Sequence, residues 1–310
     1  MGKSSKDKRD IYYRRAKEQG WRARSAFKLL QIDEEFGLFD KEIHRAVDLC
    51  AAPGSWCQVL QKKLNVPQSN KKVIAVDLQE MAPLDGIHCL QGDITDIATA
   101  QKIISYFEGE KADLVICDGA PDVTGMHDID EYIQAQLLLA ALNITLNILK
   151  EGGNFVAKIF RGKDISLLFA QLGVFFERVY CAKPKSSRNS SMESFVVCLG
   201  MKIPEGYKPT MIQPLLDQHY DNFQNEKQEN SKAPNQQTHL FNKSPNTILS
   251  PNRYIIPFLS CGDLSAYDAD LNYAVENEKK ALDPVAPPTM PAYKTAKTLI
   301  RQNDGEFLKQ

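Results

Sequence analysis

The sequence predicts an α/β protein with a mostly parallel, doubly wound sheet of the Rossmann type and helices on both faces. Two observations lead to this fold class. Between residues 24 and 200, short β-rich runs alternate with stretches of helical periodicity, and this order is typical of parallel strands joined by right-handed crossovers. Acidic residues also stand at the ends of several β-rich runs, where parallel sheets bind their ligands.

The β-rich runs predict seven strands. Only about a dozen residues without helical periodicity join the last two runs, so these two are expected to pair antiparallel. We therefore predict a mostly parallel seven-stranded sheet with an antiparallel edge strand. The predicted strands are 44–50, 71–77, 86–91, 112–118, 153–160, 174–182 and 193–200.

Helical spacing of apolar residues recurs between these runs. The predicted helices are 24–36, 54–65, 95–107, 128–149 and 164–172. Asp128 is placed to cap the longest of them. The core face of this helix is expected to consist of Ile129, Ile133, Leu137, Ala140, Ala141, Ile144 and Ile148.

Composition divides the chain into four parts. A basic arm over 1–23 precedes the α/β domain over 24–203. Residues 204–250 are rich in Asn, Gln, Pro and Lys and are expected to be a flexible linker. Apolar residues return in 252–273, so the extension over 251–310 is expected to dock on the domain or on a partner.

Charge and cysteine usage narrow the class of protein. The net charge is −1, but residues 1–28 hold ten Lys/Arg against three Asp/Glu, which favours contact with phosphates over a merely solvated terminus. No apolar run approaches the roughly 20 residues of a membrane helix. The seven cysteines form no CxxC pair, so we expect reduced thiols, no metal site and a reducing compartment.

A loop at 47–60 (VDLCAAPGSWCQVL) is the predicted cofactor site. A strand ends there, turns through Pro53 and Gly54, and opens a helix. The pattern GxGxxG is missing, so a pyrophosphate is poorly cradled and a Rossmann dehydrogenase is disfavoured. S-adenosylmethionine carries no phosphate and needs one close backbone approach with acids nearby. Asp48 is well placed for its amino group or for a water.

Two more carboxylates follow successive strands. Asp77 stands 23 residues after Gly54, where an acid typically accepts hydrogen bonds from ribose hydroxyls. Asp93 follows the third strand and is placed to receive the adenine amine. Each acid alone is more simply a helix cap or a solvated loop residue. Together they favour a nucleoside-containing cofactor.

Charged residues in apolar surroundings are the candidate catalytic groups. Lys158 lies within the apolar run VAKIF, and Asp118 ends the neighbouring strand, so the two are expected to pair. Glu193 opens the last strand, and Lys28 lies on the first predicted helix. Taken singly, Lys158 is equally well explained as half of a structural ion pair, and Lys28 as a solvated helix residue.

Five motifs, in order, carry a family resemblance: RARSAFKL, DLCAAPGSW, DLVICDGAP, GGNFVAKIF and KPKSSRNSSMESF. Over residues 20–200 the chain resembles the FtsJ (RrmJ) family of RNA 2′-O-ribose methyltransferases, which implies the Rossmann-like fold of S-adenosylmethionine-dependent methyltransferases. One departure is Cys50, where a glycine is common. The resemblance implies a catalytic tetrad of Lys28, Asp118, Lys158 and Glu193. It implies cofactor contacts from Gly54, Trp56, Asp77, Asp93 and Asp118.

The tetrad suits methyl transfer to a ribose hydroxyl, a weak nucleophile that must be aligned with the departing group. Lys158 is expected to orient the hydroxyl oxygen, and it takes the proton only if its pKa is depressed. These two roles stay open at this point. A catalytically inactive RNA-binding module is disfavoured because all four residues are present.

The extension and the basic arm bear on the choice of RNA. The segment PFLSCGDLSAYDAD (257–270) resembles the eukaryotic tRNA branch of the family. This implies anticodon-loop nucleotides 32 and 34 as targets, a cytoplasmic location, and two partner proteins, one with WD40 repeats and one separate adaptor. The alternative is a ribosomal-RNA enzyme, nucleolar or mitochondrial. Side chains expected to contact RNA are Tyr12, Tyr13, Trp21, Ser187, Arg188 and Ser190.

Overall fold

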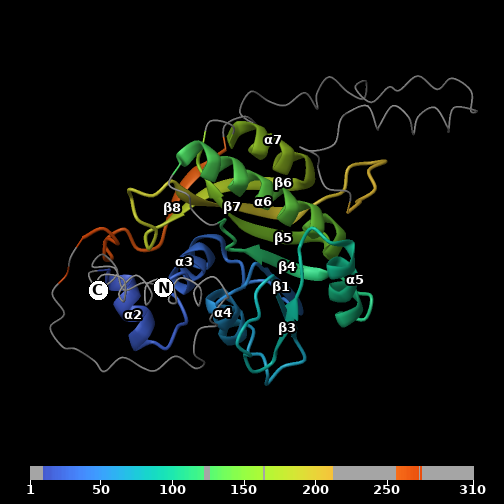
Figure 1. The fold of residues 1–310 in the computed structure, drawn as a ribbon, viewed down its shortest axis with the longest axis horizontal. Coiled ribbons are helices and arrows are strands. Elements are labelled where there is room, and N and C mark those ends of the chain that lie inside the picture. Colours follow the sequence, from blue (N-terminus) through green and yellow to red (C-terminus); the bar gives the residue numbers. More distant parts are fainter. Residues whose placement is uncertain (1–9, 122–125, 163–164, 212–255, 272, 274–310) are drawn as a thin grey trace, which may run out of the picture.

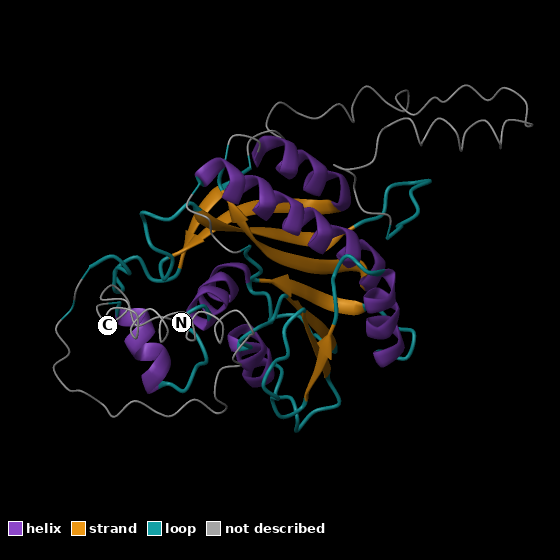
Figure 2. Ribbon diagram, viewed as in Figure 1, coloured by secondary structure: helices purple, strands orange, loops and turns teal. Residues whose placement is uncertain are grey.

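A computed structural model describes residues 10–121, 126–162, 165–211, 256–271 and 273 of the chain. Within this part, a single twisted sheet carries helices on both faces (Figures 1 and 2), which confirms the predicted α/β class. Most of the predicted linker, from residue 212 to its end at 250, and the tail beyond 273 lie outside the described residues. No helix in the described ranges is long and apolar enough to cross a membrane.

The sheet has the strand order β3-β2-β1-β4-β5-β7-β6-β8, with a switch point between β1 and β4. Neighbours from β3 to β5 are parallel, and β7 is antiparallel to both β5 and β6. The strands are β1 Arg45–Leu49, β2 Lys72–Asp77, β3 Ile87–Gln91, β4 Ala112–Cys117, β5 Leu149–Phe160, β6 Phe176–Pro184, β7 Glu193–Met201 and β8 Phe258–Cys261.

Two details of the sheet differ from the prediction. The described residues form eight strands rather than seven, because Phe258–Cys261 adds β8 in parallel to β6. The reversed strand β7 is not at the edge: it fills the place between β5 and β6. Its residues 194–198 are all buried, as expected for a central strand covered on both faces. The apolar run SFVVC therefore already carried the signal of a central position.

The helices divide between the two faces of the sheet. They are α3 Ala26–Phe36 and α4 Ser55–Lys63 on one face, with α5 Ile97–Tyr106, α6 His127–Ile148 and α7 Ile165–Phe175 on the other. Side chains alternate along the strands, so Ala157 packs under α6 while Val156 joins the core beneath α3 and α4. Lys158 follows in this alternation and therefore faces the α3–α4 side.

The start of α6 differs from the prediction. The helix begins at His127, and its cap residue Met126 makes no side-chain capping bond, so Asp128 lies in the first turn instead. The predicted core face holds only in the second half of the helix. In the first turns Ile129 and Ile133 are exposed, whereas Asp130 and Gln134 are buried.

The basic arm contains an additional helix, α2 Ile11–Glu18, whose start is capped by the carboxylate of Asp10. Tyr12 is buried and donates a hydrogen bond of 2.8 Å from its hydroxyl to the carbonyl of Tyr267 in the C-terminal segment. The N-terminal helix and the segment after β8 thus lie together beside the α/β domain (Figure 1).

Candidate active site

Lys158 and Asp118 form a buried ion pair at the ends of adjacent strands. The Lys158 ammonium donates to the Asp118 carboxylate at 2.9 Å and to the Asp118 carbonyl at 2.7 Å. Desolvation lowers the pKa of Lys158, but the negative charges of Asp118 and Glu193 outweigh it, so the pKa is raised above its ordinary value. Lys158 is therefore a charged donor in the protein as it stands.

Lys28 and Glu193 form a second pair beside the first. The Lys28 ammonium lies 2.7 Å from both carboxylate oxygens of Glu193, and the Ser187 hydroxyl donates to one of them at 2.7 Å. Burial opposes ionisation of Glu193, but Lys28 and Lys158 prevail and lower its pKa to about 2. Lys28 is only 9% exposed, so its placement on a solvated helix face is excluded.

The strand register brings the two pairs together. In the antiparallel ladder between β5 and β7, Lys158 stands opposite Phe195 and Phe160 opposite Glu193. Each pair contains one lysine and one carboxylate, so the buried charges cancel within the cluster, which makes burial of four ionised groups tolerable. All four tetrad residues predicted from the sequence are thus brought to one place.

Lys183 lies beside the tetrad and was missed by sequence reasoning. Its ammonium is buried and donates to the carbonyls of Ser191 and Glu193 at 2.6 and 2.7 Å. Desolvation lowers the pKa of Lys183, an effect that Glu193 partly offsets. These bonds join the two ends of the loop that carries Ser187. The only signal in the sequence was a lysine directly after the short run VYCA.

The loop between β1 and α4 makes a tight turn that requires glycine at position 54. Gly54 caps α4 with φ of 99°, a left-handed conformation that favours glycine. A Cβ at this position would meet the Arg22 guanidinium at 2.8 Å. Arg22 donates to the carbonyls of Pro53, Ala82 and Pro83 at 2.8–3.0 Å and so joins the two loops on this side.

Asp48 is a buried acid at the floor of this loop. One of its oxygens accepts from the Cys57 thiol at 2.9 Å, and the other is buried without a hydrogen-bond partner among the described residues. Burial, together with smaller contributions from the nearby Asp118 and Asp77, raises the pKa of Asp48 to about 8. An unsatisfied buried acid beside two carboxylates suits a ligand that brings a positively charged amine.

The other predicted cofactor acids are partly used by the protein itself. Asp77 accepts from the Ala52 amide at 2.8 Å and thereby fixes the loop after β1. Asp93 is exposed, and one oxygen accepts from the amide and the hydroxyl of Thr95. Asp77 is the last residue of β2 and Asp93 follows β3, as predicted, and each carboxylate has further acceptor capacity.

The side chain of Trp56 is directed into the core rather than toward the solvent. Its ring is buried against Phe195, with centroids 5.6 Å apart, and its indole donates to the Ser25 carbonyl at 2.8 Å. The side chain thus joins α4 to α3 and β7. Toward a ligand this residue offers its backbone amide in the first turn of α4, where helix amides are unpaired.

Several basic and aromatic residues that could contact RNA are engaged within the protein. Arg24 and Arg188 both pair with the buried carboxylate of Asp10, and Arg14 donates to the Tyr273 carbonyl. Trp21 is buried as well. Tyr13 and the exposed Ser190 are less constrained, and their contact with RNA stays a prediction. Among the described residues, no cluster of His, Cys, Asp or Glu is placed to hold a metal ion.

Acids stand near the carboxyl ends of β1, β2 and β4, around the switch point where doubly wound α/β proteins bind their ligands. The family model described as FtsJ-like methyltransferase matches residues 21–201. The chain belongs to this family.

Individual relatives show how far the likeness extends. The mouse protein named tRNA (cytidine(32)/guanosine(34)-2'-O)-methyltransferase is 55% identical over 100% of this chain and 89% of its own. The budding yeast 27S pre-rRNA (guanosine(2922)-2'-O)-methyltransferase is 44% identical over 68% of this chain and 25% of its own. A solved Plasmodium falciparum structure, titled as a ribosomal RNA methyltransferase, shares the fold with a TM-score of 0.52 and 24% identity, covering 58% of this chain and 98% of its own.

Proposed function

We propose that this protein is an S-adenosylmethionine-dependent tRNA methyltransferase that modifies the ribose 2′-hydroxyls of anticodon-loop nucleotides 32 and 34. The buried Lys158–Asp118 pair beside Lys28 and Glu193 carries the methyl-transfer part of the proposal. The family supports the same reaction class. The choice of tRNA is supported by the mouse relative, which matches the whole chain.

The residues beyond β1 and β2 fit S-adenosylmethionine. Gly54 gives the loop its tight left-handed turn before α4, and Asp48 offers an unsatisfied oxygen where an amine would be stabilised. Asp77 and Asp93 retain acceptor capacity for ribose hydroxyls and the adenine amine. When bound, this cofactor supplies a methyl group activated by a positively charged sulfur.

The raised pKa of Lys158 supports an orienting role for this residue in the first step. Because the pKa of Lys158 is raised, the ammonium keeps its proton and donates a hydrogen bond to the ribose oxygen. Asp118 and Glu193 hold that ammonium in place. An added positive charge beside Lys158 lowers its pKa, so the residue becomes a better proton acceptor only when the site is filled. Orientation thus precedes any proton transfer.

The C-terminal segment favours tRNA over ribosomal RNA. The yeast ribosomal-RNA enzyme matches 68% of this chain, whereas the mouse tRNA enzyme matches all of it. In the described part of the extension, β8 pairs with β6, and Asp270 accepts from the amides of Asn189 and Ser190. The extension therefore supports the loop that carries Ser187 and Arg188 beside Glu193. A ribosomal-RNA substrate is the second candidate.

We further propose a cytoplasmic location and two separate partner proteins, one with WD40 repeats, that direct the enzyme to one nucleotide or the other. These proposals follow from the tRNA branch of the family. They predict that the isolated chain binds the cofactor but modifies tRNA slowly until a partner is added.

A transfer assay tests the function. The protein is incubated with labelled cofactor and separate tRNA or ribosomal-RNA pools, with and without cell extract. We expect label in tRNA, and none in transcripts with deoxyribose at both nucleotides 32 and 34. Lys158→Ala is expected to abolish transfer while the cofactor dissociation constant changes little. Label in ribosomal RNA alone would refute the tRNA assignment, and no label in any pool would leave an RNA-binding module.

A further inference from the structure

The ladder between β4 and β5 ends just before the catalytic pair. Its last partners are Cys117 and Ala157, and the next residues on the two strands are Asp118 and Lys158. Beyond that point β4 and β5 are no longer paired, so their ladder does not fix the separation of the two backbone segments. The Lys158 ammonium must nevertheless meet the Asp118 carboxylate at hydrogen-bond distance.

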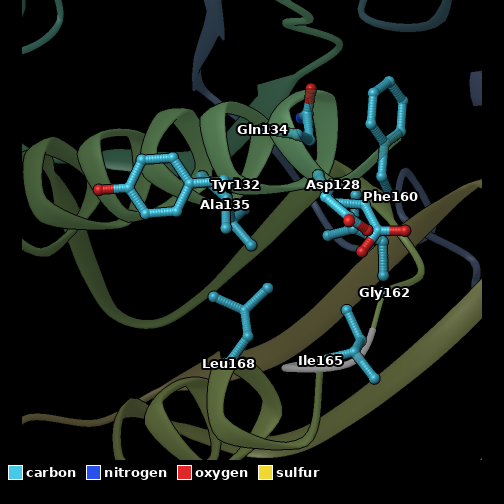
Figure 3. A pocket seen from close by; sticks show the side chains of 11 residues that line it. Asp128, Tyr132, Gln134, Ala135, Phe160, Gly162, Ile165 and Leu168 are labelled. Carbon is cyan, nitrogen blue, oxygen red and sulfur yellow. The ribbon is translucent and has the colours of Figure 1, made fainter. Parts of the chain in front are cut away.

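Gln134 of α6 bridges these two backbone segments. Its side-chain nitrogen donates to the carbonyl of Gly119 at 3.1 Å and to the carbonyl of Lys158 at 3.0 Å. The residue is 2% exposed. It lies at the edge of a cavity of about 270 Å³ between α6, β5 and α7. In Figure 3 its amide is directed away from Leu168 and Ile165, which lie on the opposite side of that cavity.

The chemistry at this position singles out glutamine. An amide nitrogen carries two hydrogens without a charge, so it satisfies two carbonyls at once. Glutamate has the same shape but at most one hydrogen, and methionine has the same length but none. The amide oxygen of Gln134 is buried without a partner among the described residues. A protein core does not tolerate such an acceptor for packing alone.

The helix face supports the same assignment. In the first turns of α6, Ile129 and Ile133 are exposed, while Asp130 and Gln134 point inward. Each buried polar residue directly follows an isoleucine. If packing alone set the orientation of the helix, the isoleucines would face the core. The inward polar face occurs at the end of α6 that lies beside the carboxyl ends of β4 and β5.

We propose that Gln134 is a positioning residue for methyl transfer: it holds the backbone of Gly119 and Lys158 so that the Lys158–Asp118 pair has its working geometry. This inference rests on the proposed function. It differs from a structural role because the loss of the bridge disturbs the reacting groups while the cofactor loop and the RNA surface keep their places.

The test uses the full chain with its tRNA substrate and any partner that the activity requires. Gln134→Met removes both donors at constant length. Gln136→Met is the matched control, since Gln136 is half-buried on the same helix and its side chain has no hydrogen-bond partner among the described residues. For each protein, kcat, the KM for tRNA and the cofactor dissociation constant are measured.

We expect Gln134→Met to lower kcat on the order of 100-fold, because a small misplacement of reacting groups has that effect. The KM and the cofactor dissociation constant are expected to stay within about threefold, and Gln136→Met to stay close to the unmutated protein in all three. A kcat within about threefold of the unmutated value, or an equal loss in cofactor binding, would overturn the proposal.

A second variant keeps the inference testable if Gln134→Met folds poorly. In Gln134→Glu the protonated carboxyl keeps one donor, while the ionised form has none and repels both carbonyls. Its kcat, divided by that of Gln136→Glu, should rise as the pH is lowered. A ratio that does not change with pH would refute the bridge. Failure of the unmutated protein to label tRNA would instead refute the proposed function.

Discussion

Asp48 gives the sharpest test of the electrostatics. Its pKa lies at about 8 in the folded protein, against 3.8 for an ordinary aspartate. Above about pH 4 the unfolded chain therefore releases a proton that the folded chain retains. The stability associated with Asp48 is complete below the ordinary pKa and is lost as the pH rises toward 8. Each pH unit in this window costs up to tenfold in the folding equilibrium.

Asp48→Asn removes this titration without changing the shape of the side chain. The free energy of unfolding of the variant, minus that of the unmutated protein, should rise by at most about 3 kcal/mol between about pH 5 and pH 7. An offset common to all pH values is expected, because the new amide lacks a partner at the buried oxygen position. The slope, not the offset, reports the shifted pKa.

Urea unfolding of both proteins at several pH values measures this slope. Asp113→Asn is the control. Asp113 is also buried, but hydrogen bonds from Lys150 and from the amides of Arg45 and His44 outweigh desolvation and lower its pKa. Its contribution is lost only as the pH falls through that lowered value, so its effect should be constant over this range. If the free-energy difference for Asp48→Asn were equally independent of pH, the conclusion that Asp48 is protonated in the folded protein would be refuted.

Three further changes test other contacts. Glu193→Gln removes a charge that raises the pKa of Lys158, so the limb of the kcat–pH profile that reports Lys158 should move to lower pH. Lys183→Met removes the donors to Ser191 and Glu193 and should lower kcat about 10-fold, whereas the half-buried Lys185→Met should not; equal kcat values would contradict this. Arg22→Met frees the carbonyls of Pro53 and Ala82, so calorimetry should show about 10-fold weaker cofactor binding with kcat at saturation retained.

The sequence predicted those elements and site residues that a local pattern of apolar and charged residues marks. Strand ends were placed within a few residues because apolar runs stop where polar ligand-facing residues begin, as at Asp77 and Asp118. Lys158 was identified because a lysine in an apolar strand needs a partner. The position of β7 was harder to predict, since the choice between an edge and a central place depends on where a neighbouring strand lies.

The residues that sequence reasoning missed have backbone partners. Gln134 and Lys183 bind carbonyl groups, and every residue has a carbonyl, so no pattern of side chains marks the contact. Helical periodicity even pointed the wrong way in the first turns of α6, where it placed Ile133 inside. The helix instead turns a polar face toward the site, and there the need to hold two strands together exceeded the gain from burying an isoleucine.

The two halves of the site treat buried charge differently, and this follows from what each half must do. The catalytic half contains two lysines and two carboxylates at close range, so its charges cancel before any substrate arrives and its geometry is fixed in advance. The cofactor half contains Asp48, an acid with one unsatisfied oxygen that burial keeps protonated near neutral pH. A cationic ligand stabilises the ionised form of such an acid. In the proposed reaction, the pre-paired charges of the tetrad keep the weak nucleophile aligned, and the unsatisfied oxygen of Asp48 attracts a positively charged methyl donor.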